Sequence, residues 1–169
     1  MIHVLRLGHR RGRDDRISSH VGLTARQLGA AKITYAGEKD DNMLQSIKDV
    51  SERWGGSMEI EYREDYRNII RNFDGTSVHL TMYGRDFQQH LNTCRTDDLL
   101  VVVGSQKVPR DIYDMVDHNL AVGHQPHSEV AALGIFLYEV NSRDIPDDFE
   151  EATIEVIPSD TGKKTQELD

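Results

Sequence analysis

Two glycine-ended segments carry the residues best suited to binding a ligand. Residues 99–109 and 119–133 each contain a short apolar run that ends in a glycine, Gly104 in the first and Gly123 in the second. Such runs are typical of strands buried on both faces of a parallel sheet. Ligands of open α/β sheets bind at the edge where the strands end, and glycine lets the backbone approach them closely. We expect a small-molecule site between these two loops, built mostly from backbone.

Several other chemistries lack their motifs. The sequence has no G-x-G-x-x-G fingerprint, no phosphate-binding P-loop and no G-x-S-x-G nucleophile elbow. His118, His124 and His127 lie close in sequence, but no H-E-x-x-H motif occurs and Cys94 is the only cysteine. We therefore expect no metal site, and we expect His124 and His127 to make hydrogen bonds within a ligand loop.

Charge is distributed unevenly along the chain. The whole sequence carries a net charge of −9, which argues against a protein that coats nucleic acid indiscriminately. Residues 1–37 nevertheless hold seven Lys/Arg and two Asp, a local balance of +5, so the remainder sums to −14. A basic segment of this kind can bind phosphates. The alternative interpretation is a solvated loop that is rich in arginine.

The length of 169 residues fits one domain with a sizeable core. We expect that domain to cover residues 1–169, with a polar and loose tail from about residue 159. No apolar run approaches the roughly 20 residues that span a membrane, and the first residues become charged too soon for a signal peptide. A single cysteine suits a reducing compartment. These features predict a cytoplasmic protein.

Strand and helix patterns alternate, which predicts an α/β fold with a mostly parallel sheet and helices on both faces. We expect the first helix to begin at Ser18 or Ser19, and Asp40 or Asp41 to cap the second. Further helices are expected at residues 65–73, at 85–93, just after residue 109 and at 128–140, and strands at 2–7, 32–36, 58–62, 78–82, 99–103, 120–122 and 153–157.

Long blocks of the sequence resemble one family. The glycine-ended segments at residues 79–84, 101–109 and 120–133 are similar to the cofactor loops of SPOUT methyltransferases. Residues 4–29, Arg53-Trp-Gly-Gly56 and Val78-His-Leu-Thr-Met-Tyr-Gly84 are more specific, because they resemble the archaeal-type tRNA (cytidine-56-2′-O)-methyltransferases. The similarity runs from residue 1 to about residue 164. It implies a C-terminal trefoil knot, a homodimer, S-adenosylmethionine as cofactor and tRNA as substrate.

The resemblance also implies which residues bind the cofactor. Apart from it, Ser128 is explained equally well as a helix N-cap and Glu129 as a favourable charge in the first turn. The implied cofactor-binding residues are Leu80, Thr81, Met82, Gly84, Val103, Gly104, Ser105, Gln106, Lys107, Val108, Val122, Gly123, His124, Gln125, Pro126, His127, Ser128 and Glu129.

The implied reaction is methylation of a ribose 2′-hydroxyl, that of cytidine 56 in the tRNA T-loop. This hydroxyl is a poor nucleophile, so its proton must be taken up or its alkoxide stabilised. Leu23 falls near the position where many SPOUT enzymes carry a catalytic arginine. We therefore consider Arg16, Arg26 and His20 as the catalytic candidates, and we expect RNA phosphates to be bound by Arg10, Arg11 and Arg13.

Two alternative functions remain open at this point. The chain could be a SPOUT methyltransferase that acts on another RNA. It could also be a non-catalytic nucleotide-binding α/β domain, although a pure small-molecule sensor has no need of the basic N-terminal segment.

Overall fold

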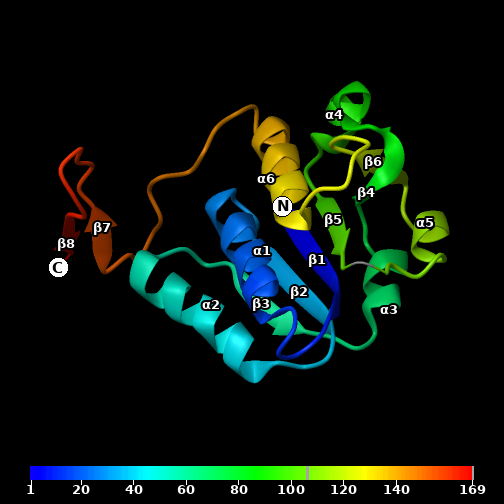
Figure 1. Cartoon of the computed structure of the whole chain (residues 1–169). Coiled ribbons are helices and arrows are strands. Elements are labelled where there is room, and N and C mark those ends of the chain that lie inside the picture. Colours follow the sequence, from blue (N-terminus) through cyan, green and yellow to red (C-terminus); the bar gives the residue numbers. More distant parts are fainter. Residues whose placement is uncertain (106, 169) are drawn as a thin grey trace.

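A parallel sheet forms the centre of the molecule (Figure 1). The computed structural model describes residues 1–105 and 107–168. In these residues the sheet has six strands in the order β3-β2-β1-β5-β4-β6, and every neighbouring pair is parallel. The strands are β1 (Ile2–His9), β2 (Lys32–Gly37), β3 (Glu59–Tyr62), β4 (Thr76–Asp86), β5 (Leu99–Gly104) and β6 (His118–Ala121).

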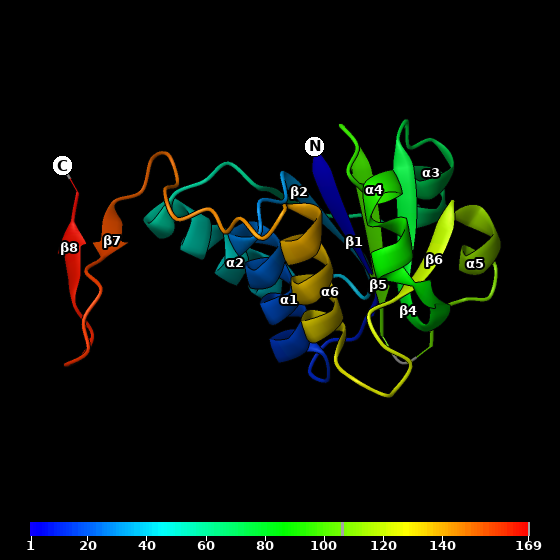
Figure 2. The ribbon, with the colours of Figure 1, turned by 90° about the horizontal axis from the view of Figure 1, so that it is seen from above.

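Helices cover both faces of the sheet, as the alternating pattern predicts (Figure 2). One face carries α1 (Asp15–Gln27), α2 (Asp41–Trp54) and α6 (Glu129–Val140), with α1 in contact with both others. The opposite face carries α3 (Tyr66–Arg71) and α5 (Ile112–Met115).

Each face of the sheet has its own hydrophobic core. Side chains alternate along β1, so Val4 packs in the core beneath α1, α2 and α6, whereas Leu5 and Leu7 pack against α3 and α5. No residue in 99–103 is more than 1 % exposed, since β5 is buried on both faces. The apolar run there therefore predicted its environment correctly.

The ends of α2 follow the expected chemistry. The Asp40 side chain caps the helix by accepting a hydrogen bond of 3.0 Å from the Met43 amide. Gly55 ends it with a φ of +76°, a conformation that side-chain-bearing residues rarely adopt.

The first helix begins earlier than predicted. It starts at Asp15, and neither Ser18 nor Ser19 is its cap. Ser18 is instead fully buried, and its hydroxyl lies 2.8 Å from Nδ1 of His9. The prediction was wrong because this hydroxyl bonds a side chain from β1 rather than the helix terminus.

The helix predicted at residues 85–93 is also different. β4 continues to Asp86, because after a bulge Arg85 and Asp86 pair with β6 again. Asp86 then caps a short 3-10 helix, η1 (Phe87–His90), which leads into α4 (Leu91–Cys94).

The C-terminal region forms a small antiparallel hairpin that stands away from the central sheet (Figures 1 and 2). Its first strand, β7 (Ile154–Val156), was predicted. Its second, β8 (Thr165–Glu167), lies in the polar tail and was not. Within the described residues, no helix is long and apolar enough to cross a membrane.

Candidate cofactor cleft and basic loop

A cleft of about 740 Å³ lies at the bulge of β4, where β5 ends and α6 begins. It is lined by residues of the three glycine-ended loops, as the sequence predicts for a site at this edge of the sheet. The predicted residues that line it are Leu80, Thr81, Met82, Gly104, Ser105, Lys107, Val108, Val122, Pro126, His127, Ser128 and Glu129. We call this the cofactor cleft.

The remaining predicted residues are placed elsewhere. Gly84, Val103, Gly123, His124 and Gln125 do not line the cleft. Val103 is 1 % exposed in the core, and Nε2 of His124 lies 3.0 Å from the Gly84 carbonyl oxygen, joining two loops beside the cleft. Gln106 lies outside the described residues.

Four residues outside the predicted set also line the cleft: His79, Tyr83, Tyr113 and Ala132. Three of them lie within the segments similar to cofactor loops, whereas sequence reasoning missed Tyr113. The Tyr113 hydroxyl lies 3.0 Å from Thr81 Oγ1, and its ring meets His79 edge-on with centroids 4.9 Å apart. Burial lowers the pKa of His79, while its hydrogen bond with Asn119 opposes the shift. Tyr113 comes from α5, so no sequence spacing relates it to β4.

Gly104 is required by a close approach. A Cβ at this position would lie 2.0 Å from Cγ2 of Val108, which is far inside van der Waals contact. Glycine therefore allows the chain after β5 to fold back over the end of the strand. Leu80, Val108 and Val122 give the cleft apolar walls, and Ser128 and Glu129 place polar groups at the N-terminus of α6.

A buried ion pair supports the polar side of the cleft. Arg6 is fully buried near the end of β1, and Nη2 donates to Glu129 Oε1 at 3.1 Å while Nη1 donates to the Leu7 carbonyl. Burial lowers the pKa of Arg6, and the charges of Glu129 and Asp14 oppose that shift. The Glu129 side chain keeps 26 % exposure, so the pair joins the buried strand to the cleft.

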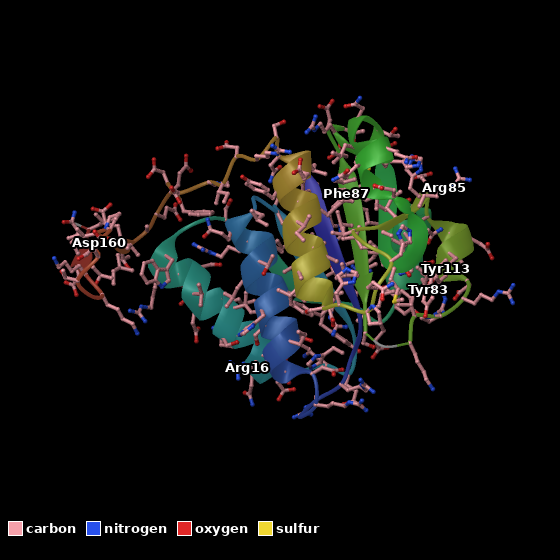
Figure 3. All side chains as sticks on the ribbon, turned by 45° about the horizontal axis from the view of Figure 1, so that its top comes forward. Arg16, Tyr83, Arg85, Phe87, Tyr113 and Asp160 are labelled. Carbon is pink, nitrogen blue, oxygen red and sulfur yellow. The ribbon has the colours of Figure 1, made fainter. Side chains whose placement is uncertain are left out.

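Two of the basic candidate residues, Arg11 and Arg16, line a second cleft of about 670 Å³, which we call the N-terminal cleft. Asp15 and Asp40 line it as well. Figure 3 shows Arg16 at the start of α1, well apart from Tyr83 and Tyr113 of the cofactor cleft. Within one chain, Arg16 therefore does not line the cofactor cleft.

The other predicted RNA-binding residues lie on the loop before α1. Nε of Arg10 donates to Asp14 at 3.0 Å, and the hydrogen bond raises the pKa of the guanidinium. Arg13 is exposed on the same loop. The Arg11 amide donates to Glu38 Oε2 at 2.9 Å, which holds the loop near the start of α2.

Arg26 and His20 also lie outside the cofactor cleft. Arg26 donates to the carbonyl oxygens of Trp54 and Gly55 at 2.8 and 2.6 Å, and its guanidinium lies 4.5 Å from the Phe149 ring centroid. It borders a larger cavity of about 980 Å³ between α1, α2 and the C-terminal segment. That cavity contains none of the predicted cofactor residues. Arg26 thus binds the C-terminal end of α2, and His20 is exposed on α1.

The three clustered histidines do not converge on one point. His127 Nδ1 lies 2.7 Å from the Gln125 carbonyl oxygen, and His124 contacts Gly84 as described. The His118 ring lies beside His90, with centroids 5.6 Å apart.

Comparison with known proteins shows which family the chain resembles. The family model described as tRNA ribose 2′-O-methyltransferase, aTrm56, matches residues 54–166. A tRNA (cytidine(56)-2′-O)-methyltransferase of Thermococcus kodakarensis is 46 % identical over 100 % of this chain and 98 % of its own length. One of Archaeoglobus fulgidus is 49 % identical, covering 96 % of both chains.

The fold is also that of solved RNA methyltransferases. An AdoMet-bound rRNA methyltransferase from Sinorhizobium meliloti superposes with a TM-score of 0.63 at 18 % identity, over 86 % of this chain and 57 % of that chain. At this identity the likeness concerns the fold alone.

Proposed function

The chain belongs to the tRNA ribose 2′-O-methyltransferase family, and from that premise we propose that it methylates the ribose of cytidine 56 in tRNA, with S-adenosylmethionine as the methyl donor. The observation that carries the proposal is the match to named relatives over nearly the whole chain. The cofactor cleft at the expected sheet edge supports it. A tRNA substrate also suits action in the cytoplasm.

The cleft fits this cofactor in size and in chemistry. A volume of about 740 Å³ is ordinary for a small-ligand site. Leu80, Val108 and Val122 would pack against the faces of the adenine ring, and Ser128 and Glu129 would hold polar parts, with the Glu129 carboxylate complementary to a cationic centre. When bound, S-adenosylmethionine supplies an activated methyl group on a sulfonium centre.

The basic loop would bind the tRNA backbone. Arg10, Arg11 and Arg13 precede α1 on one exposed loop, so their guanidinium groups can reach phosphates without entering the cofactor cleft. The ribose 2′-hydroxyl is the group that distinguishes RNA from DNA at such a site.

Arg16 is our candidate for stabilising the developing alkoxide at the ribose. It is exposed and faces the N-terminal cleft, whereas Arg26 is already bound to the end of α2. Because a guanidinium stays protonated and cannot accept a further proton, the role of Arg16 would be electrostatic. Arg16→Ala should lower the single-turnover methylation rate about 100-fold or more, with cofactor and tRNA affinity little changed. A near-normal rate would transfer the role to His20.

We propose that the active enzyme is a homodimer. Ile135 of the mainly apolar α6 is 48 % exposed, and Arg16 does not line the cofactor cleft of its own chain. A second copy of the chain would cover Ile135 and bring its own Arg16 to the cofactor cleft. Mixing Arg16→Ala with a variant defective in cofactor binding should then restore part of the activity. A monomer in sedimentation analysis, or no restoration, would contradict the dimer.

We also propose the trefoil knot implied by the family. β6 is the edge strand beside β4, whereas α6, which follows it, contacts α1 and also α4 in the connection between β4 and β5. These positions suit a chain in which residues 122–128 pass through that connection. An experimental structure whose chain trace is not knotted would overturn this.

We propose that no metal ion takes part in methyl transfer. His118, His124 and His127 have separate partners rather than a shared centre. A single-turnover rate at saturating tRNA that requires zinc, and that loses this requirement in His124→Gln or His127→Gln, would contradict this.

The proposed function can be tested with matched substrates. Purified protein should transfer a labelled methyl group to a tRNA transcript with cytidine at position 56, and transfer should stop with 2′-deoxycytidine at that position. Equal labelling of both transcripts would place the methyl group on another atom or nucleotide.

A further inference from the structure

Three potential metal ligands meet where β1, α1 and α2 come together. His9 ends β1, Asp15 begins α1, and Asp40 precedes α2. One ligand atom from each side chain lies within 4.8 Å of the other two. The cluster borders the N-terminal cleft, which Asp15 and Asp40 help to line, and it is separate from the cofactor cleft.

His9 provides the observation that points to a cation. Its side chain is fully buried, and Nε2 makes no hydrogen bond within the described residues. That atom is directed at two carboxylates, with Asp40 Oδ2 at 3.5 Å and Asp15 Oδ1 at 4.0 Å. A buried polar atom without a partner is costly, and an ion shared with the carboxylates would satisfy it.

The two separations from His9 suit an ion between the three side chains, and the ligand atoms of Asp15 and Asp40 lie within 4.8 Å of each other. Zinc binds histidine nitrogen and carboxylate oxygen at about 2.0–2.2 Å, so two ligands of a tetrahedral ion lie about 3.4 Å apart. The distance of 3.5 Å from His9 to Asp40 already matches. The distance of 4.0 Å to Asp15 needs a shift of a few tenths of an ångström, about what ligation demands. The Asp15 side chain is half exposed, so packing does not prevent this shift.

Each ligand is held by a second partner. His9 Nδ1 lies 2.8 Å from Ser18 Oγ, the kind of contact that orients metal-binding histidines. The Met43 amide donates to Asp40 Oδ1 at 3.0 Å, and the Gly12 amide donates to Asp15 Oδ1 at 2.7 Å. Asp40 Oδ2, the atom that faces His9, is thus left for the ion.

The ligand types and charges select the class of ion. One neutral imidazole and two carboxylates carry two negative charges, which a divalent ion cancels. Imidazole suits zinc and similar transition metals, whereas magnesium and calcium prefer oxygen ligands throughout. Three protein ligands leave a fourth position of a tetrahedral ion for water.

We propose that His9, Asp15 and Asp40 form a binding site for a divalent transition-metal ion of the zinc class. The ion fixes the basic loop between β1 and α1 against the start of α2. This proposal does not rest on the proposed function, because ion binding is measured without tRNA or cofactor.

The test is calorimetric titration of untagged, chelator-stripped protein with zinc chloride. One equivalent should bind, and magnesium chloride should give no comparable heat. Cobalt(II), used as a spectroscopic probe, should give a visible absorption band that zinc abolishes. Asp15→Asn, which changes a half-exposed side chain and should keep the fold, should weaken zinc binding at least about tenfold. His9→Gln, checked by circular dichroism, should remove it.

Two control variants make the assignment specific. Asp41→Asn changes the neighbouring carboxylate, which pairs with Lys39 at 2.9 Å, and should leave zinc affinity unchanged. His90→Gln removes one member of the other histidine pair and should also have no effect. The proposal is overturned if zinc does not bind, which would mean that Nε2 holds a proton only. It is equally overturned if Asp15→Asn binds zinc normally or if His90→Gln abolishes binding.

Discussion

Removing one partner of the Arg6–Glu129 pair should cost far more stability than removing one partner of a shorter ion pair on the surface. The Arg6 side chain is fully buried, with 0 % exposure to water, and its carboxylate partner is Glu129 at 3.1 Å. The Arg67–Asp111 pair is shorter, at 2.6 Å, but its side chains are 40 % and 47 % exposed. Distance alone ranks the second pair higher, whereas burial ranks the first higher.

The expected magnitudes follow from burial. Removing one partner of a buried pair costs about 3–5 kcal/mol, because the remaining charge stays uncompensated. Since Glu129 keeps 26 % exposure, we place Glu129→Ala at the lower end, about 3 kcal/mol. Loss of a favourable charge at the helix N-terminus adds less than about 1 kcal/mol. Asp111→Ala should cost no more than about 1 kcal/mol, as is usual for exposed pairs.

Thermal and denaturant unfolding at one protein concentration measure both changes. For a chain of this size, 1 kcal/mol corresponds to a shift in melting temperature of about 2–4 °C. Glu129→Ala should therefore lower it by about 6–12 °C, and Asp111→Ala by less than about 4 °C. Adding Arg6→Met to Glu129→Ala should recover part of the loss, because the unpaired charge is gone. Equal losses in the two single variants, or no recovery in the double variant, would refute the reasoning.

Three further predictions concern the loops and pH. Gly123 has a φ of +145°, so Gly123→Val should strain its loop by about 1–3 kcal/mol. Calorimetry should then show S-adenosylmethionine binding that is weakened about tenfold. The control variant Gly162→Val, at a φ of +142° in the tail, should leave this binding unchanged. Arg11→Ala should reduce the slope of log affinity for tRNA against log salt by about 0.7–0.9, whereas Arg63→Ala, which removes an arginine paired with Asp65, should not; an unchanged slope in Arg11→Ala would make the loop a solvated one. Burial, followed by the charge of Lys32, lowers the pKa of His3 from 6.5 to about 4. The contribution of His3 to stability is therefore present above pH 6.5 and is lost as the pH falls towards 4. His3→Gln should flatten the curve of unfolding free energy against pH over that range, and an unchanged curve would contradict the shift.

Local patterns predicted the elements that local chemistry determines. The apolar run at residues 99–103 predicted a strand buried on both faces, and the choice of Asp40 or Asp41 as a helix cap predicted the start of α2. Most of the residues predicted from the glycine-ended loops line one cleft, because parallel strands bring their carboxyl ends to one edge; that they bind the cofactor stays a prediction.

Contacts between distant segments could not be predicted in the same way. Ser18 has the residue type of a helix cap, but the fold places His9 beside it. Arginine is usually a surface residue, yet Arg6 is buried, and its carboxylate partner Glu129 lies 123 positions later in the chain. Tyr113 enters the cleft from α5, and Arg16 lies in the N-terminal cleft. Each of these depends on tertiary packing rather than on spacing.

Mass-spectrometric mapping can locate the methyl group in a tRNA transcript incubated with the purified protein and S-adenosylmethionine. We expect one new 2′-O-methyl group, on cytidine 56, which is absent when the cofactor is omitted. A transcript that stays unmodified, or one methylated only at another nucleotide or on a base, would contradict it.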